Sequence, residues 1–192
     1  TLVNQWLKAK RSMITPSTYA NFILIAENHL IPYFGKRRIG SITEQDIQEY
    51  IMHLYSYGRL DKKGGLTVKT IRDVILVLRM SMEYAYRMKA IPLLNWELVE
   101  YPKELHSHRV VSLNKDDEQK LIQCIYMNLN RRTAGILIAL FTGVRIGELC
   151  ALQMSDISLA DKTITISKTV QRIYNKQTGT SYIHIGPPKT KT

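Results

Sequence analysis

Apolar side chains recur every three or four positions through much of residues 2–88, which is the spacing of one face of a helix. This stretch divides into four helical patterns, a short one near its start and longer ones that begin at Thr15, Thr43 and Thr67. Each threonine is a suitable N-cap, because its side-chain oxygen accepts a hydrogen bond from the first helical turn. The pattern predicts a compact four-helix bundle, in which Gly35 ends the second helix and "GRLDKKGG" forms a flexible connection before the fourth.

The texture of the sequence changes at about residues 100–111, where prolines and isolated charges interrupt any apolar period. We expect a linker here, which gives one domain over residues 1–106 and a second over 107–192. Helical patterns return over about 113–128 and 132–141.

The end of the sequence is rich in Thr, Ile, Val and Tyr, which is typical of strands. A short helix starts near Val144, and then "KTITISKTVQRIY" and "TSYIHIG" flank the turn-prone stretch "NKQTG", which predicts a β-hairpin. The fold class is therefore mainly α with a small β-hairpin, an α+β arrangement.

Charge favours a polyanionic partner for both predicted domains. The 192 residues include 27 Lys and Arg against 16 Asp and Glu, a formal charge of +11 with a pI near 9.7. The surplus is shared, with 15 basic against 10 acidic residues before position 107 and 12 against 6 after it. Nucleic acid is favoured over an anionic membrane surface. No apolar run is long enough to span a bilayer and no basic-then-apolar leader opens the chain, so we expect a cytoplasmic protein.

Metal and disulfide chemistry have little support in the sequence. Cys124 and Cys150 lie in apolar helical patterns without the paired spacing of a zinc site, so both are expected to be small core side chains. No cluster of Asp, Glu and His suggests a metal, and no cofactor is expected.

The stretch "FTGVRIGELC" places an arginine at the start of a helix, where the partial positive charge of the helix end disfavours a cation. Arg145 and Glu148 are three positions apart on one face, and we expect Ile146, Leu149 and Leu152 to face the core. A surface ion pair is one interpretation. The apolar surroundings favour another, in which the arginine occupies a buried corner and Glu148 orients its guanidinium to bind a phosphate.

The segment "TGVRIGELCALQMSDI" resembles the first conserved box of the tyrosine recombinases, also called the phage integrase family. The segment "LIPYFGKRRIGSITEQDIQEYI" and the fourth helical pattern are similar to the SAM-like core-binding domain of that family, a small bundle that clamps DNA. The resemblance covers nearly the whole chain. It implies site-specific recombination for integration or excision of mobile DNA, in which a tyrosine attacks a phosphodiester and a 3′-phosphotyrosyl bond forms.

The resemblance also implies roles for individual residues. Arg145 would hold non-bridging oxygens of the scissile phosphate, and Glu148 would support it. Lys189 in "IHIGPPKT" would protonate the departing 5′-oxygen, with Lys168 and Lys191 as alternatives in the same region. Two cations of this kind suit phosphoryl transfer without a metal. No segment resembles the family's His-x-x-Arg box or its nucleophilic tyrosine, so the chain alone is expected to be inactive.

The expected partner is double-stranded DNA, with self-association as a synaptic tetramer in the full-length protein. Thr67, Lys69, Thr70 and Arg72 lie off the apolar stripe of the fourth helix and are predicted to contact DNA, although a solvated helix face fits them equally. Two other classes of protein remain open: an integrase-like DNA-binding protein without chemistry and an enzyme similar to type IB topoisomerases.

Overall fold

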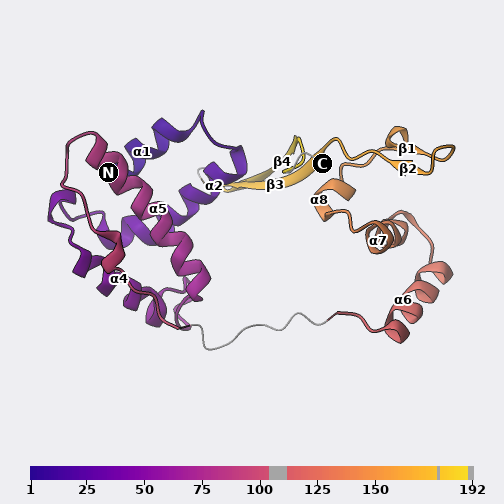
Figure 1. The fold of residues 1–192 in the computed structure, drawn as a ribbon, viewed down its shortest axis with the longest axis horizontal. Coiled ribbons are helices and arrows are strands. Elements are labelled where there is room, and N and C mark those ends of the chain that lie inside the picture. The colour runs from indigo at the N-terminus through magenta and orange to yellow at the C-terminus, as the bar shows by residue number, and fades with distance from the viewer. Residues whose placement is uncertain (104–111, 177, 190–192) are drawn as a thin grey trace. The chain divides into compact units, whose positions relative to one another are not determined.

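The computed structural model describes residues 1–103, 112–176 and 178–189. Its contacts divide the chain into two compact units (Figure 1), one of Thr1–Ser107 with Lys176–Thr178 and one of His108–Asn175 with Gly179–Thr192. The linker predicted over residues 100–111 lies in large part outside the described residues, so the boundary between residues 106 and 107 stays a prediction.

The first unit is the predicted helical bundle. Its elements are α1 (Leu2–Lys10), α2 (Pro16–Ile25), a π-helical turn (Ala26–Leu30), α3 (Ile31–Phe34), a 3₁₀ turn (Ile39–Ser41), α4 (Glu44–Tyr57), α5 (Val68–Arg87) and a 3₁₀ turn (Trp96–Leu98). As expected, Gly35 follows the last residue of the second helical pattern.

The π-helical turn marks where the second helical pattern changes its hydrogen bonding. The Ile31 N–H donates to the carbonyl of Ala26, five residues back. The next residue, Pro32, has no N–H to donate, so the ladder of four-residue bonds is interrupted beside it.

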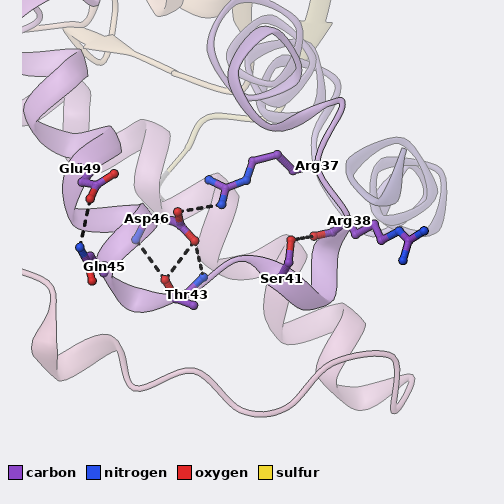
Figure 2. A network of polar contacts seen from close by, with 7 residues as sticks. All are labelled: Arg37, Arg38, Ser41, Thr43, Gln45, Asp46 and Glu49. Atoms are coloured by element: carbon purple, nitrogen blue, oxygen red, sulfur yellow. Dashed lines mark hydrogen bonds and ion pairs between the residues drawn. The ribbon is translucent and has the colours of Figure 1, made fainter.

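All three predicted threonine caps are present. The side chains of Thr15, Thr43 and Thr67 accept hydrogen bonds from the backbone N–H three residues further on. At α4 the cap is reciprocal, because Asp46 Oδ2 accepts from the Thr43 N–H at 2.9 Å. Asp46 also binds Arg37 Nη2 through its other oxygen at 2.8 Å, so one carboxylate ties the preceding connection to the start of α4 (Figure 2).

These contacts favour the ionised form of Asp46. The Thr43 N–H, and to a smaller extent Arg37, hold the pKa of this carboxyl below its ordinary value of 3.8. Arg37 is therefore committed to an ion pair, whereas Arg38 beside it uses its carbonyl to accept from the Ser41 hydroxyl (Figure 2).

The core of the first unit surrounds α5, whose apolar stripe is buried along its whole length. Trp6 from α1, Leu30 from the π-helical turn and Tyr50 from α4 pack into the same core. The Tyr50 hydroxyl donates to the carbonyl of His29 at 2.7 Å, which satisfies its polar group, and burial raises the pKa of Tyr50 above its ordinary value.

The connection between α4 and α5, for which the sequence predicts a flexible loop, contains several internal hydrogen bonds. Arg59 N–H donates to the Gly64 carbonyl at 3.0 Å, and the Arg59 guanidinium grips Asp61 with two bonds of 2.7 and 3.0 Å. Gly65 lies so close to α4 that a Cβ there would be 1.5 Å from the Tyr55 carbonyl oxygen, so only glycine fits.

The second unit combines short helices with two antiparallel hairpins. Its elements are α6 (Lys115–Met127), α7 (Arg131–Thr142), α8 (Ile146–Leu149), a 3₁₀ turn (Met154–Asp156), β1 (Ile157–Ser158), β2 (Thr163–Ile164), β3 (Thr169–Asn175) and β4 (Thr180–Gly186). The pairing of β3 with β4, in which Val170 faces Ile185, confirms the predicted hairpin.

The predicted extent of the first strand of this hairpin is wrong. The stretch "KTITISKTVQRIY" is divided, because β2 pairs with the unpredicted strand β1 and the Thr165 N–H donates to the Asp156 carbonyl. The paired segment β3 begins only at Thr169. Strand propensity alone does not reveal which partner each part of a β-rich stretch will find.

Several burial predictions for the second unit are also wrong. Ile146 is 75% exposed, because α8 is a single turn and packs on β3 through Gly147. Cys124 and Cys150 are both exposed rather than part of the core. The helices within the described residues are each too short or too polar to span a bilayer.

Candidate functional site

The site begins where α7 ends. Gly143 adopts a left-handed backbone conformation with φ of +68°, and its N–H donates to the Ala139 carbonyl at 2.9 Å. A residue with a Cβ enters this region at a cost, which glycine does not pay. The chain therefore turns sharply, and Arg145 becomes the N-cap of α8 two residues later.

Arg145 and Glu148 form a pair with two contacts. The Arg145 backbone N–H donates to Glu148 Oε2 at 3.1 Å, and Arg145 Nη1 donates to Glu148 Oε1 at 3.2 Å. The carboxylate thereby satisfies one of the backbone donors at the helix start and neutralises part of the helix-end charge. This explains how a cation is accommodated at a position that the helix dipole disfavours.

The two members of the pair differ strongly in exposure. The Glu148 side chain is 8% exposed, whereas that of Arg145 is 65% exposed. The expectation of a buried arginine is therefore wrong, and the buried member is the glutamate. Of the five N–H donors of a guanidinium, the described residues engage one, so most of the fork faces outward. This geometry suits a phosphate, which accepts two parallel bonds from one arginine.

Gly147 brings α8 unusually close to β3, a feature that the sequence analysis missed. A Cβ at this position would be 2.6 Å from Thr169 Oγ1 and 2.8 Å from the Val170 carbonyl oxygen. The missing side chain allows the helix that carries Arg145 to rest directly on the hairpin. The available signal was a glycine inside a predicted helical turn, which often marks a close approach.

A cleft of about 440 Å³ opens beside the pair. Its polar side chains include Arg145, Glu148 and Lys162, and its apolar wall comes from α7, β2 and the chain around them, with Ile138, Val144, Leu152, Ile164, Ile166 and Pro188. Lys162 lies in the turn before β2 with φ of 54°, and the sequence analysis did not single it out.

The segment that contains Lys189 reaches this cleft, but the lysine itself does not. Pro188 lines the cleft, but Lys189 itself is exposed and does not line it. Lys168, one alternative, donates to Gln153 Oε1 at 3.2 Å. Lys191, the other, lies outside the described residues. The catalytic role of Lys189 stays a prediction.

The four predicted DNA contacts cluster at the amino end of α5. Thr67, Lys69, Thr70 and Arg72 are all exposed, while Val68 and Ile71 between them are buried. The hydroxyls of Thr67 and Thr70 lie 2.9 Å apart and bind each other, and the Arg72 guanidinium lies over the ring of Tyr101. The prediction that these side chains leave the apolar stripe is confirmed, and their role in DNA binding remains a prediction.

Metal ligands do not gather near either group. Within residues 1–103, 112–176 and 178–189, no three His, Cys, Asp or Glu side chains are placed where they could hold a metal ion.

Comparison with known proteins agrees with this fold. Residues 1–55 match the family model described as the phage integrase N-terminal SAM-like domain. The chain is 28% identical over 129 residues to tyrosine recombinase XerC of Bacillus pumilus (strain SAFR-032), covering 65% of this chain and 39% of the relative. It is 27% identical over 175 residues to the ICEBs1 integrase of Bacillus subtilis (strain 168), covering 88% and 44%. The chain thus spans less than half the length of these relatives.

Solved structures share the fold. The Tn1549 transposon integrase in complex with a circular intermediate DNA aligns with a TM-score of 0.71 at 21% identity, covering 99% of this chain and 58% of that one. A lambda integrase tetramer bound to a Holliday junction aligns with a TM-score of 0.63 at 16% identity, covering 95% and 48%. Together these matches confirm the predicted resemblance to the tyrosine recombinases, or phage integrases, and the mainly helical fold class.

Proposed function

We propose that this chain supplies the DNA-clamping domain and the first part of the catalytic domain of a site-specific tyrosine recombinase. The observation that carries the proposal is the Arg145–Glu148 pair, in which a buried carboxylate fixes an exposed guanidinium at a helix start. The similarity to XerC and to integrases of mobile elements supports the same class of activity.

The proposed chemistry is transfer of a DNA phosphoryl group to a tyrosine and back. Arg145 binds non-bridging oxygens of the scissile phosphate, where its fork stabilises the charge that builds in the transition state. Glu148 holds the arginine, and Lys189 gives a proton to the departing 5′-oxygen. The nucleophilic tyrosine and the second arginine box have no counterpart in these 192 residues, so the chain alone binds DNA without cleaving it.

The proposed partner is duplex DNA, bound by both basic units, and the complete recombinase acts as a synaptic tetramer. The surplus of 11 positive charges supports DNA binding. The lambda integrase with which the chain shares its fold is a tetramer bound to a Holliday junction, which supports the assembly.

The test is Arg145→Lys in a recombinase that contains this chain together with its tyrosine. Lysine keeps the charge but loses the bidentate fork, so cleavage of a half-site substrate should fall by about 10²–10³-fold while DNA affinity changes far less. Arg132→Lys is the matched control, because Arg132 is an exposed arginine of α7 outside the cleft and should leave cleavage intact.

Near wild-type cleavage by Arg145→Lys, with a lowered melting temperature, would reduce Arg145 to a structural ion pair. Relaxation of supercoiled DNA without strand exchange would instead favour an enzyme similar to type IB topoisomerases. Binding without cleavage by the complete protein would favour a DNA-binding protein without chemistry.

A further inference from the structure

A segment after α5 returns along the bundle and is fastened to α4. We call residues 95–101 the strap. The Asn95 N–H donates to Glu44 Oε1 at 2.8 Å at one end of the strap. Near its other end, the Gln48 amide binds both backbone groups of Glu100, accepting from its N–H at 2.9 Å and donating to its carbonyl at 3.2 Å. Contacts at both ends therefore hold the strap against α4.

Two aromatic rings of the strap lie under arginines of α5. The Arg72 Cζ is 5.4 Å from the centroid of the Tyr101 ring, and the Arg79 Cζ is 5.8 Å from that of Trp96. Both distances fall within the range of a cation–π interaction. The two arginines are seven residues apart, about two helical turns, and so project from the same face of α5.

The two arginines differ in their ion-pair partners. Arg79 Nε donates to Glu83 Oε1 at 2.8 Å, which neutralises much of its charge. Arg72 is exposed and has no ion pair among the described residues, so the ring of Tyr101 is the contact that holds its guanidinium. Arg72 also belongs to the exposed group at the amino end of α5, with Lys69 and Thr70.

The ring of Tyr101 limits the freedom of Arg72. A long arginine side chain loses many rotamers when it binds a phosphate, and a side chain already held against a ring loses fewer. Burial raises the pKa of the Tyr101 hydroxyl, and the nearby charge of Arg72, together with that of Arg79, opposes this shift.

We propose that Tyr101 is a positioning residue for DNA binding, holding the Arg72 guanidinium with its N–H edge toward a backbone phosphate. Gln48 fixes Tyr101 in turn through the backbone of Glu100. This role rests on the proposed function, because it requires that the chain binds duplex DNA. It links Tyr101, which lies at the start of the predicted linker, to a predicted DNA contact on α5.

The experiment measures the dissociation constant of the 192-residue chain for a mixed-sequence duplex DNA over a range of salt concentrations. Tyr101→Leu removes the ring but keeps an apolar side chain, and should weaken binding about two- to fivefold. Its salt slope should stay unchanged, because the phosphate contact still forms. Arg72→Ala should lower the slope by about 0.9, the value of one phosphate contact. Tyr101→Phe should bind like the wild type.

Two further variants make the result specific. Trp96→Leu removes the same kind of stacking from an arginine that Glu83 already neutralises, so it should leave DNA affinity unchanged. In the Arg72→Ala background, Tyr101→Leu should have no additional effect. Gln48→Ala keeps the Tyr101 ring but removes the two hydrogen bonds that hold the backbone of Glu100, and it should also weaken DNA binding. This variant replaces Tyr101→Leu as the test if Tyr101→Leu lowers the melting temperature.

The outcomes separate this proposal from the proposed function. Failure of the wild-type chain to bind duplex DNA would overturn both. Wild-type binding together with an unchanged affinity for Tyr101→Leu and Gln48→Ala would overturn the positioning role alone. The same conclusion would follow if Tyr101→Leu weakened binding equally in the presence and absence of Arg72.

Discussion

Gly147→Ala should destabilise the second unit, although alanine is the better helix former. The new Cβ would meet Thr169 Oγ1 at 2.6 Å and the Val170 carbonyl oxygen at 2.8 Å. The threonine side chain can rotate away, but the carbonyl belongs to the backbone of β3, so α8 and the hairpin must separate. Overpacking of this kind costs about 1–3 kcal/mol, and the helix preference of alanine returns about 0.5–1 kcal/mol. The expected net loss in the free energy of unfolding is therefore up to about 2.5 kcal/mol.

Gly135→Ala is the matched control, because it makes the same substitution in α7 of the same unit. A Cβ at Gly135 would lie 3.5 Å from Leu149 Cδ2, an ordinary van der Waals contact. Only the helix preference applies there, so this variant should gain about 0.5–1 kcal/mol. The difference between the two variants isolates the cost of the clash.

The assay is urea denaturation followed by two probes. Both tryptophans, Trp6 and Trp96, lie in the first unit, so their fluorescence reports on that unit alone, while circular dichroism reports on both. Gly147→Ala should move the unfolding of the second unit, which is visible in circular dichroism but not in fluorescence, to lower urea concentration. Equal stability of the two alanine variants would refute the close packing of α8 on β3.

Three further predictions concern single residues and the whole chain. Glu148→Ala should lower the free energy of unfolding of the second unit by about 1–2 kcal/mol in urea denaturation, because it leaves the Arg145 N–H without its acceptor. Glu148→Gln should cost less, because its amide oxygen still accepts this hydrogen bond. Equal losses for the two variants would contradict this role of Glu148. Because folding lowers the pKa of Asp46, its contribution to stability is present above the unfolded pKa of about 3.8 and is lost as the pH falls through the folded pKa. Asp46→Asn should therefore reduce the fall in the first unit's melting temperature at acidic pH. An unchanged pH dependence of the melting temperature would exclude this role of Asp46. The 192-residue chain should bind duplex DNA with an affinity that falls steeply as the salt concentration rises. It should form no covalent adduct with a suicide DNA substrate in a denaturing gel. A trapped adduct would show that the chain contains its own nucleophile.

Local interactions made much of the fold predictable from sequence. Thr15, Thr43 and Thr67 were recognised as caps because each bonds to a residue only three positions away. The Arg145–Glu148 pair was predicted for the same reason, since its spacing alone brings the two side chains together.

The features that the sequence did not reveal depend on contacts between distant segments. The exposure of Ile146 follows from the side of α8 that packs on β3, and the fastening of Glu100 by Gln48 joins residues 52 positions apart. The division of the β-rich stretch depends on β1, which is too short for a pattern to indicate. The choice among Lys168, Lys189 and Lys191 depends in the same way on which segment the fold brings next to Arg145.

The unequal exposure of the Arg145–Glu148 pair has an electrostatic consequence. The pair carries no net charge, but its negative end lies inside the protein and its positive end points outward. The pair is thus an oriented dipole, whose positive end meets an approaching polyanion first. At physiological ionic strength its reach is about 8 Å, so in the proposed function it would act on a phosphate only after the other basic residues had brought the strand close. The proposed function would thereby assign long-range attraction and the final selection of one phosphate to different charges of the same chain.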